Sequence, residues 1–271
     1  MSGASRESSA AARERLEALT DSQSVDAARL AEELLAVTRL LDREVGLRRT
    51  LTDPARSGEA KAELIASLLR GQVGSDTVEL VSGLVRSRWS APRDLVDAVE
   101  QLAALAEIVD AHRSGALDDV EDELFRFGRI VAGNPGLRAA LTDPAADAAA
   151  KTQLVKRLLD GRAKPVTVRL IVALVTQPRG RSLDGGLEEY SRLAAGRRDR
   201  VVALVTTAVP LSDLQRERLG TSLARLVGRQ VHLNVVADPA VLGGIRVQIG
   251  DEIIEGTIAS RLDSARQGLA G

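Results

Sequence analysis

The stretch LRRTLTDPARSGEAKAELIASLL, residues 47–69, occurs a second time as LRAALTDPAADAAAKTQLVKRLL, residues 137–159. The two stretches are 90 residues apart and are identical at 12 of 23 positions. The similarity continues downstream, where TVELVSGLV from Thr77 aligns with TVRLIVALV from Thr167. One repeat of this length is longer than the common helical solenoid units, so we interpret the chain as containing a duplicated domain.

Each copy predicts the same order of turn and helix. Pro54 and its equivalent Pro144 cannot continue a helix, and each disfavours helical geometry at the preceding aspartate, so LTDP ends one helix and begins a turn. The next helix is predicted to begin at a residue that accepts from free N–H groups and to end at a glycine. These boundaries are Ser57 and Gly71 in the first copy, Asp147 and Gly161 in the second.

Hydrophobic periodicity within the copies indicates small all-helical bundles. Leucines recur at i, i+4 in the helix after LTDP, which predicts that Lys61 and Lys151 face solvent. The leucines of this pattern are Leu64 and Leu68 in the first copy, Leu154 and Leu158 in the second. The following helix repeats apolar positions at Val78, Val81 and Val85, and at Val168, Ile171 and Val175. Two more helices are expected near residues 27–41 and 117–131.

The last 70 or so residues change to strand periodicity. VVALVTTAV from Val201 is short and β-branched, and QVHLNVVAD and IRVQIG alternate apolar with polar residues. Between them, SDLQ from Ser212 predicts a capping box and a helix that ends at Gly228. Gly250 and Asp251 predict a tight turn before EIIEGTI, and a short helix is expected at residues 262–269. The predicted fold is mainly α: two tandem helical bundles, residues 1–104 and 105–198, followed by a small α+β domain, residues 199–271.

Composition excludes several kinds of function. A net charge of -1 argues against a surface that binds nucleic acid, and the chain has no cysteine and two histidines, His112 and His232, in different predicted domains. Four aromatic residues are too few for a base-stacking platform. The run VLGGIRVQIGDE lacks the spacing of a phosphate-binding loop. We therefore expect no catalytic residue, no metal and no cofactor, and the short apolar runs predict a cytoplasmic, soluble chain.

The C-terminal residues resemble a known family. VTTAVPLS, residues 205–212, and DPAVLGGIRVQIGDEIIEGTIASRLDSARQGL, residues 238–269, closely resemble the signature of the F-type ATP synthase delta subunit, whose mitochondrial counterpart is the oligomycin-sensitivity-conferring protein. The pattern around LTDP also resembles that family's helical bundle. The usual bacterial member has one bundle, whereas this chain has two, as in actinobacterial members. It also has Glu255 and Thr257 where Asp and Ser are expected.

The resemblance implies a non-catalytic stator subunit in the peripheral stalk of the proton-translocating enzyme, at the cytoplasmic face of the bacterial membrane. The implied partners are the N-terminal helices of the alpha subunits and the C-terminal helices of the b subunit. The residues expected to bind partners are Asp238, Pro239, Leu242, Gly243, Gly244 and Ile245 in the C-terminal domain, and Val78, Val81 and Val85 in the first bundle. The two adjacent glycines are expected to permit a tight backbone path.

The residues themselves leave two other kinds of function open. An enzyme would need a site that the sequence does not show, whereas a free-standing helical adaptor unrelated to ATP synthase would also use amphipathic bundles.

A further hypothesis concerns the two copies. Glu79, Ser82 and Gly83 of the first copy correspond to Arg169, Val172 and Ala173 of the second, which makes the second copy more apolar. We hypothesise that the first bundle presents the main alpha-binding groove and that the second is partly covered.

Overall fold

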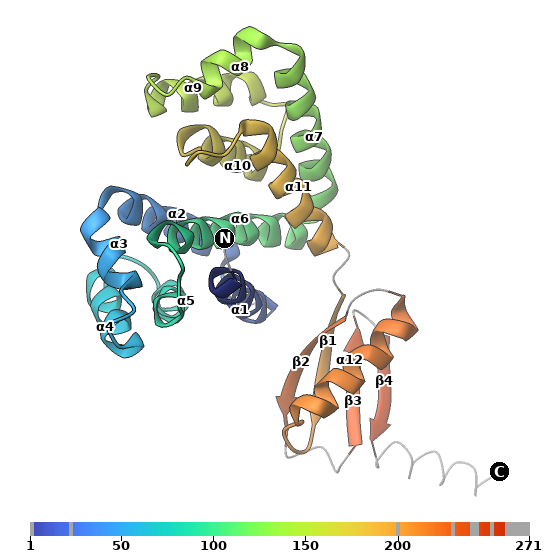
Figure 1. Ribbon diagram of the computed structural model, residues 1–271. Helices are drawn as coiled ribbons and strands as arrows, with labels where there is room; N and C mark the ends of the chain where they lie inside the picture. Colours follow the sequence, from blue (N-terminus) through green and yellow to red (C-terminus); the bar gives the residue numbers. More distant parts are fainter. Residues whose placement is uncertain are drawn as a thin grey trace, which may run out of the picture. The chain divides into compact units, whose positions relative to one another are not determined.

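The computed structural model describes residues 3–21, 24–198, 201–228, 231–238, 244–249 and 252–257. The chain divides into two compact units, residues 1–198 and residues 199–271 (Figure 1). The first unit is entirely helical in its described residues, and the second contains a sheet and one described helix. In the described part of the chain, no helix is both long and apolar enough to span a bilayer.

The first unit consists of eleven helices in its described residues. The first six are α1 (Gly3–Asp21), α2 (Ala27–Arg43), α3 (Val45–Thr52), α4 (Gly58–Leu69), α5 (Ser75–Arg86) and α6 (Pro92–Arg113). The next five are α7 (Leu117–Gly133), α8 (Pro135–Thr142), α9 (Ala148–Leu159), α10 (Pro165–Thr176) and α11 (Leu183–Arg198).

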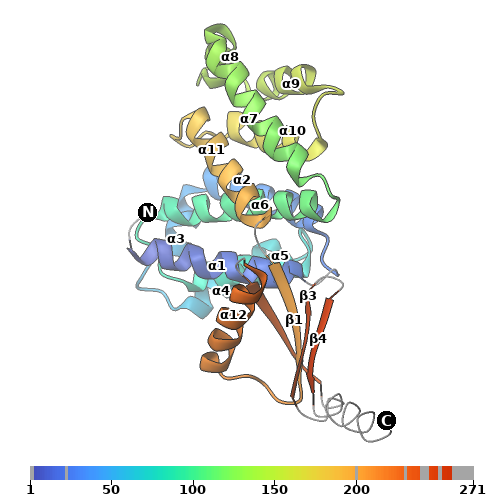
Figure 2. The ribbon, with the colours of Figure 1, turned by 90° about the vertical axis from the view of Figure 1, so that its right-hand side faces the viewer.

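The duplication shares one helix. A shift of 90 residues places α1 on α6, and it places α6 on α11. Helix α6 contacts α1, α2, α3 and α5 of the first copy and also α7, α10 and α11 of the second. Figures 1 and 2 show α7 to α11 together on one side of this helix. The expected boundary between residues 104 and 105 therefore falls inside a continuous helix, because α6 closes the first bundle and opens the second.

Local capping agrees with the sequence patterns. Helices α3 and α8 end at the threonine of LTDP, and the Oδ1 atom of the aspartate accepts from the backbone N–H two residues later at 2.9 Å in both copies. Ser57 caps α4 by accepting from the N–H of Ala60. Asp147 occupies the same position before α9 without a side-chain bond. Gly71 and Gly161 have φ of 77° and 63°, the left-handed conformation that glycine adopts without strain.

The expected orientation of the two repeated lysines is wrong. Lys61 and Lys151 are buried, with 5% and 6% of their surfaces exposed, whereas Leu68 and Leu158 are 46% and 36% exposed. The Nζ atom of Lys151 donates to the backbone carbonyl of Val175 at 3.4 Å. Because a lysine combines a long apolar stem with a donor, it packs here against the C-terminal end of the neighbouring helix.

Aliphatic side chains fill two cores in the first unit. The first core packs residues from α1 to α6, including Leu34, Ile65 and Val81. The second packs residues from α6 to α11, including Phe127 and Tyr190. Helix α6 contributes to both cores, which follows from its position between the bundles.

The second unit is a four-stranded sheet with strand order β2-β1-β3-β4. Its described elements are β1 (Val201–Thr207), α12 (Asp213–Val227), β2 (Val231–Ala237), β3 (Gly244–Ile249) and β4 (Glu252–Thr257). Strands β1 and β2 are parallel and joined through α12, while β3 is antiparallel to β1 and to β4. Leu223 of α12 packs with Ala203, Val205 and Val247 on one face of the sheet.

The expected caps of α12 are confirmed. Ser212 and Gln215 form a capping box, and the helix ends at Gly228 with φ of 71°. The expected turn at Gly250 and Asp251 and the expected helix at residues 262–269 lie outside the described residues.

Candidate functional site

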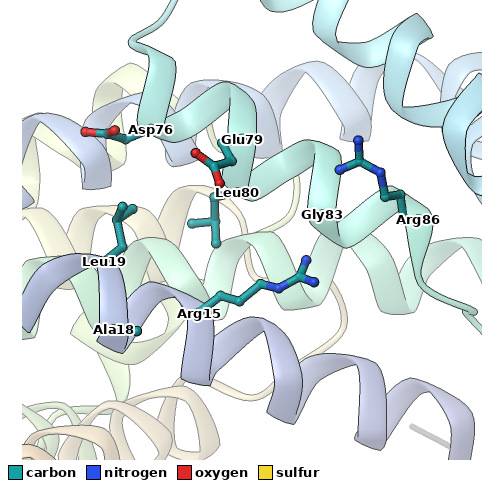
Figure 3. A pocket seen from close by; sticks show the side chains of 8 residues that line it. All are labelled: Arg15, Ala18, Leu19, Asp76, Glu79, Leu80, Gly83 and Arg86. Carbon is teal, nitrogen blue, oxygen red and sulfur yellow. The ribbon is translucent and has the colours of Figure 1, made fainter. Parts of the chain in front are cut away.

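A surface groove lies between α1 and α5 of the first bundle (Figure 3). Its volume is about 360 Å³. The two helices run in opposite directions along the groove. Leu19, near the end of α1, lies beside Asp76, near the start of α5 (Figure 3). The lining residues are Arg15, Ala18 and Leu19 of α1, and Asp76, Glu79, Leu80, Gly83 and Arg86 of α5.

The charges are separated along the groove. Asp76 lines one end, beside Leu19, Glu79 lies in the middle above Leu80, and the guanidinium groups of Arg15 and Arg86 lie toward the other end (Figure 3). Arg86 also pairs with Glu59 of α4 through two hydrogen bonds of 2.9 and 3.1 Å. The groove therefore offers an acidic end and a basic end to a bound segment.

A small residue lets a partner approach the backbone. Ala18 is exposed on α1, whereas Gly83 of α5 is buried. The guanidinium of Arg15 lies against Gly83, so that a Cβ atom at this position would collide with it. The apolar floor between the charged ends includes Leu80, which is 4% exposed.

The repeat-related surface of the second bundle is not open. The positions equivalent to Arg15, Ala18, Leu19, Asp76 and Leu80 are Leu105, Ile108, Val109, Val166 and Leu170. All five are at most 6% exposed. The equivalents of the other three lining residues, Arg169, Ala173 and Thr176, are half-buried. Leu105 belongs to the core of the first bundle, since it lies on the shared helix α6. Ile108, Val166 and Leu170 belong instead to the core of the second bundle. Sharing α6 therefore buries Leu105, while the second bundle's own packing buries the other three.

An arginine occupies the second copy's equivalent of Glu79. Arg169 donates two hydrogen bonds, of 2.7 and 2.6 Å, to the carboxylate of Glu107 on α6. Burial raises the pKa of Glu107, although the hydrogen bonds and charge of Arg169 act against it. The charge of Glu32 on α2 also acts on both residues, which places α2 of the first bundle next to this surface.

The predicted binding residues of α5 lie mostly in the core. Val81 and Val85 have no exposed surface, and Val78 is half-buried. The groove residues on the neighbouring face of α5 are Glu79, Leu80 and Gly83, of which sequence reasoning had noted Glu79 and Gly83 as differences between the copies. Arg15 and Leu19 were missed, because nothing in α1 itself shows which face stays free.

Three of the predicted C-terminal binding residues are described. Asp238 donates its backbone N–H to the carbonyl of Thr207 at 2.8 Å. Gly244 begins β3 with φ of 90°, which agrees with the expected tight backbone path at this glycine. Ile245 is half-buried and packs against the core of the second unit. Pro239, Leu242 and Gly243 lie outside the described residues.

The described ranges contain no cluster of three or more histidine, aspartate or glutamate side chains that could hold a metal ion. His112 is exposed in the last turn of α6. The groove instead has the features of a site for another polypeptide: small residues, aliphatic side chains and charges at its two ends.

Comparisons with known proteins agree with a role in a larger assembly. The family described as ATP synthase delta (OSCP) subunit matches residues 102–269. The ATP synthase subunit delta of Streptomyces griseus is 67% identical over 271 residues, covering 100% of both chains. That of Kineococcus radiotolerans is 48% identical over 269 residues, covering 99% of this chain and 98% of the relative.

A solved structure gives a weaker likeness. A chain of the mitochondrial ATP synthase of Toxoplasma gondii is 21% identical, and the alignment covers 62% of this chain and 95% of that chain. Its TM-score of 0.27 supports no argument about geometry.

Proposed function

Because the chain belongs to the ATP synthase delta (OSCP) subunit family, we propose that its first bundle binds the N-terminal helix of an alpha subunit in the groove between α1 and α5. As a member of that family it is a non-catalytic subunit of the peripheral stalk of ATP synthase, associated with the membrane through the complex. We further propose that its C-terminal unit binds the C-terminal end of the b subunit, at the cytoplasmic face of the membrane.

The shape and chemistry of the groove support a helical ligand. The exposed Ala18 allows close approach, and Leu19 and Leu80 provide an apolar floor for one face of an amphipathic helix. The separated charges favour one direction of binding. A basic residue of the partner would lie near Asp76 and Glu79, and an acidic residue near the opposite end.

Burial favours the first bundle over the second as the alpha-binding site. Chain order favours the second, since the family match begins at residue 102 and so covers the second bundle and the C-terminal unit. However, the equivalent surface of the second bundle is at most 6% exposed at five positions. Ile108, Val166 and Leu170 lie in the core of the second bundle itself, and Leu105 lies in the core of the first, so a helix would have to disturb these cores to reach them. We therefore propose that each chain binds one alpha helix.

Exposed apolar residues support partner binding by the C-terminal unit. Leu204, Val236 and Ile253 are 40%, 49% and 48% exposed. Leu204 alternates along β1 with the buried Ala203 and Val205, so it lies on the face of the sheet opposite α12. We propose that the b subunit binds this unit, with the segment from Asp238 to Ile245 at the contact. The alternative of a helical adaptor unrelated to ATP synthase is not favoured, because the full-length relatives are delta subunits.

The test is calorimetric titration of the full chain with a peptide that corresponds to the N-terminal helix of its alpha subunit. We expect one peptide per chain. Ala18→Trp fills the groove at an exposed position, and we expect it to weaken binding about tenfold or more. Ala60→Trp, at an exposed position of α4, is the matched control. Two bound peptides, or unchanged binding to the Ala18→Trp variant, would contradict the proposed site. Separate fragments are unsuitable because the cut would divide α6.

A further inference from the structure

The turn between α10 and α11 corresponds to the turn between α5 and α6 of the first copy, but the two turns contact different parts of the first unit. In the first copy the turn carries Trp89, which is 9% exposed in the first core and donates from Nε1 to the carbonyl of Leu84 at 2.9 Å. In the second copy the equivalent residue is Arg179, whose side chain is 5% exposed. Trp89 packs into the core of the first bundle, whereas Arg179 contacts α2 of the first bundle and the shared helix α6.

Arg179 lies among three carboxylates of the other copy and the shared helix. Its Nη1 atom lies 3.3 Å from Oδ2 of Asp42 on α2, and its Nε atom lies 3.4 Å from Oδ1 of Asp97 on α6. Its Nη2 atom contacts Oε2 of Glu100, also on α6. The Glu100 side chain is 1% exposed. The guanidinium therefore neutralises acids that α2 and α6 bring together.

A second arginine of the same turn completes the cluster. Arg181 donates to both carboxylate oxygens of Glu100 at 2.5 Å, and to Glu189 of α11 at 3.0 Å. Gln101 of α6 donates to the other oxygen of Glu189 at 2.6 Å. The hydroxyl of Tyr190 donates to Glu100 at 3.3 Å. The first copy has no such cluster, because the equivalents of Glu100, Arg179 and Arg181 are Ala10, Trp89 and Ala91. Within the cluster of the second copy, Asp42 of α2 is the member that belongs to the first bundle alone.

The backbone of the turn is adapted to this contact. Among the residues that the structure describes, Arg179 is the one non-glycine residue with a positive φ, at 45°. An L-residue reaches this conformation at a cost, so other interactions must hold it there. The buried ion pairs are such interactions, because removing one partner would leave the others charged and uncompensated.

We propose that the Arg179 turn is a lock that holds the second bundle in one position on the first. The shared helix joins the bundles covalently, and Arg197 of α11 pairs with Asp21 of α1 at 3.5 Å. The lock supplies contacts from a separate element to both α2 and α6. We infer that the lock carries mechanical load between the alpha subunits and the b subunit, because α11 leads into the C-terminal unit. This role rests on the proposed function.

The position of the bundles is tested on the isolated full chain. The chain has no cysteine, so Ser67→Cys on α4 and Arg157→Cys on α9 introduce two unique thiols at exposed, repeat-related positions. Nitroxide labels on both give a distance distribution by double electron–electron resonance. Arg179→Gly removes the guanidinium, and glycine adopts the positive φ without strain. We expect this variant to broaden and shift the distribution.

Two further variants make the result decisive. Arg88→Ala changes an exposed arginine in the first copy's turn, and we expect it to leave the distribution narrow. Glu100→Gln keeps the shape of the side chain and removes its charge, so it tests the lock even if Arg179→Gly fails to fold. Circular dichroism reports whether each variant stays helical. A folded variant of the cluster with an unchanged distribution would show that other contacts position the bundles, and would overturn the lock.

The load-bearing role is tested separately in the assembled enzyme. Inverted membrane vesicles that carry the Arg179→Gly chain should pump fewer protons for each ATP hydrolysed than vesicles with the wild-type chain. Equal pumping by a variant whose distance distribution is broadened would overturn the load-bearing role. Absence of the wild-type chain from the purified enzyme would instead contradict the proposed function, whatever the distances show.

Discussion

The carboxylate of Glu33 accepts a hydrogen bond of 2.5 Å from the hydroxyl of Thr77, and 90 residues later Glu123 accepts one of 2.5 Å from Thr167. The same oxygen accepts a backbone N–H from the N-cap residue of the following helix, at 3.0 Å from Gly74 and 2.9 Å from Lys164. A glutamate of α2 therefore caps helix α5 in the first bundle, and a glutamate of α7 caps helix α10 in the second. Neither N-cap residue forms a side-chain cap of its own. The duplication has kept this long-range cap although the surfaces of the two bundles differ.

Glu33→Gln should destabilise the chain by about 1.5–3 kcal/mol, because Thr77 and the N-terminus of α5 lose a charged acceptor. The measurement is chemical denaturation followed by circular dichroism. Glu63→Gln, at an exposed position of α4, is the control and should change the free energy of unfolding by less than about 0.5 kcal/mol. Equal effects of the two substitutions would argue against the cap.

The effect of Glu33→Gln should depend on pH. Burial raises the pKa of Glu33, but hydrogen bonds from Thr77, Arg29 and Gly74 outweigh it, so the pKa lies below the ordinary value of 4.5. A folded-state pKa below the unfolded one contributes stability that is present above pH 4.5 and is lost as the pH falls through the folded-state value. The difference between wild type and variant should therefore shrink in acid. A constant difference from pH 7 to pH 3 would contradict this account.

Lys61→Met and Lys151→Met should have opposite effects on stability. Burial lowers the pKa of Lys61 below its ordinary value of 10.5, with Asp53 acting in the opposite direction. The charged form is therefore disfavoured in the folded chain. The destabilisation caused by burying the charged Lys61 is fully present below its folded-state pKa and is lost as the pH rises through 10.5. Removal of this charge at pH 7 should therefore raise the midpoint of thermal unfolding.

Lys151 has a partner that offsets the cost of its burial. Its Nζ atom donates to the carbonyl of Val175, and Lys151→Met should destabilise the chain by about 1 kcal/mol through loss of that bond. Scanning calorimetry at pH 7 compares the pair directly. A drop in the midpoint for Lys61→Met as large as that for Lys151→Met would contradict the assigned difference.

Gly244→Ala should destabilise the second unit by about 1–2 kcal/mol, because φ at this position is 90° and a Cβ atom is unfavourable there. Gly220→Ala is the matched control in the same unit. This glycine lies inside α12, its added Cβ would meet Leu233 at ordinary distances of 3.8 and 3.9 Å, and alanine is the better helix former. Denaturation should therefore show one loss and one gain, while the helices of the first unit remain. Stabilisation by both substitutions would contradict the conformation of Gly244.

Ser212→Ala should cost about 0.5–2 kcal/mol through loss of the capping box with Gln215. Hydrogen exchange of the first turn of α12 measures the effect locally. Ser222→Ala, in the interior of α12, is the control, because its hydroxyl bonds only within the helix at the carbonyl of Arg218. A similar increase in exchange for both variants would count against the cap.

Much of the helical order followed from local signals. The stops at Pro54 and Pro144 and the αL glycines at Gly71 and Gly161 act within a few residues, so they are readable without knowledge of the fold. The orientation of Lys61 was predicted wrongly, because a local pattern of leucines does not show which face another helix covers. The groove was predicted only in part. Glu79 and Gly83 stood out as differences between the copies, whereas Arg15 and Leu19 did not.

The sequence by itself determined the duplication, the order of helices and strands, and the family. These depend on repeated residues, on caps and on hydrophobic period, all of which are properties of short segments. Only the tertiary structure decided that α6 belongs to both bundles, that the first copy has an open groove, and that most of the equivalent positions of the second copy are buried. It also decided that Arg179 meets Asp42, Asp97 and Glu100. Burial and ion pairing depend on surfaces brought together from distant parts of the chain, so the same repeated segment is exposed in one copy and covered in the other.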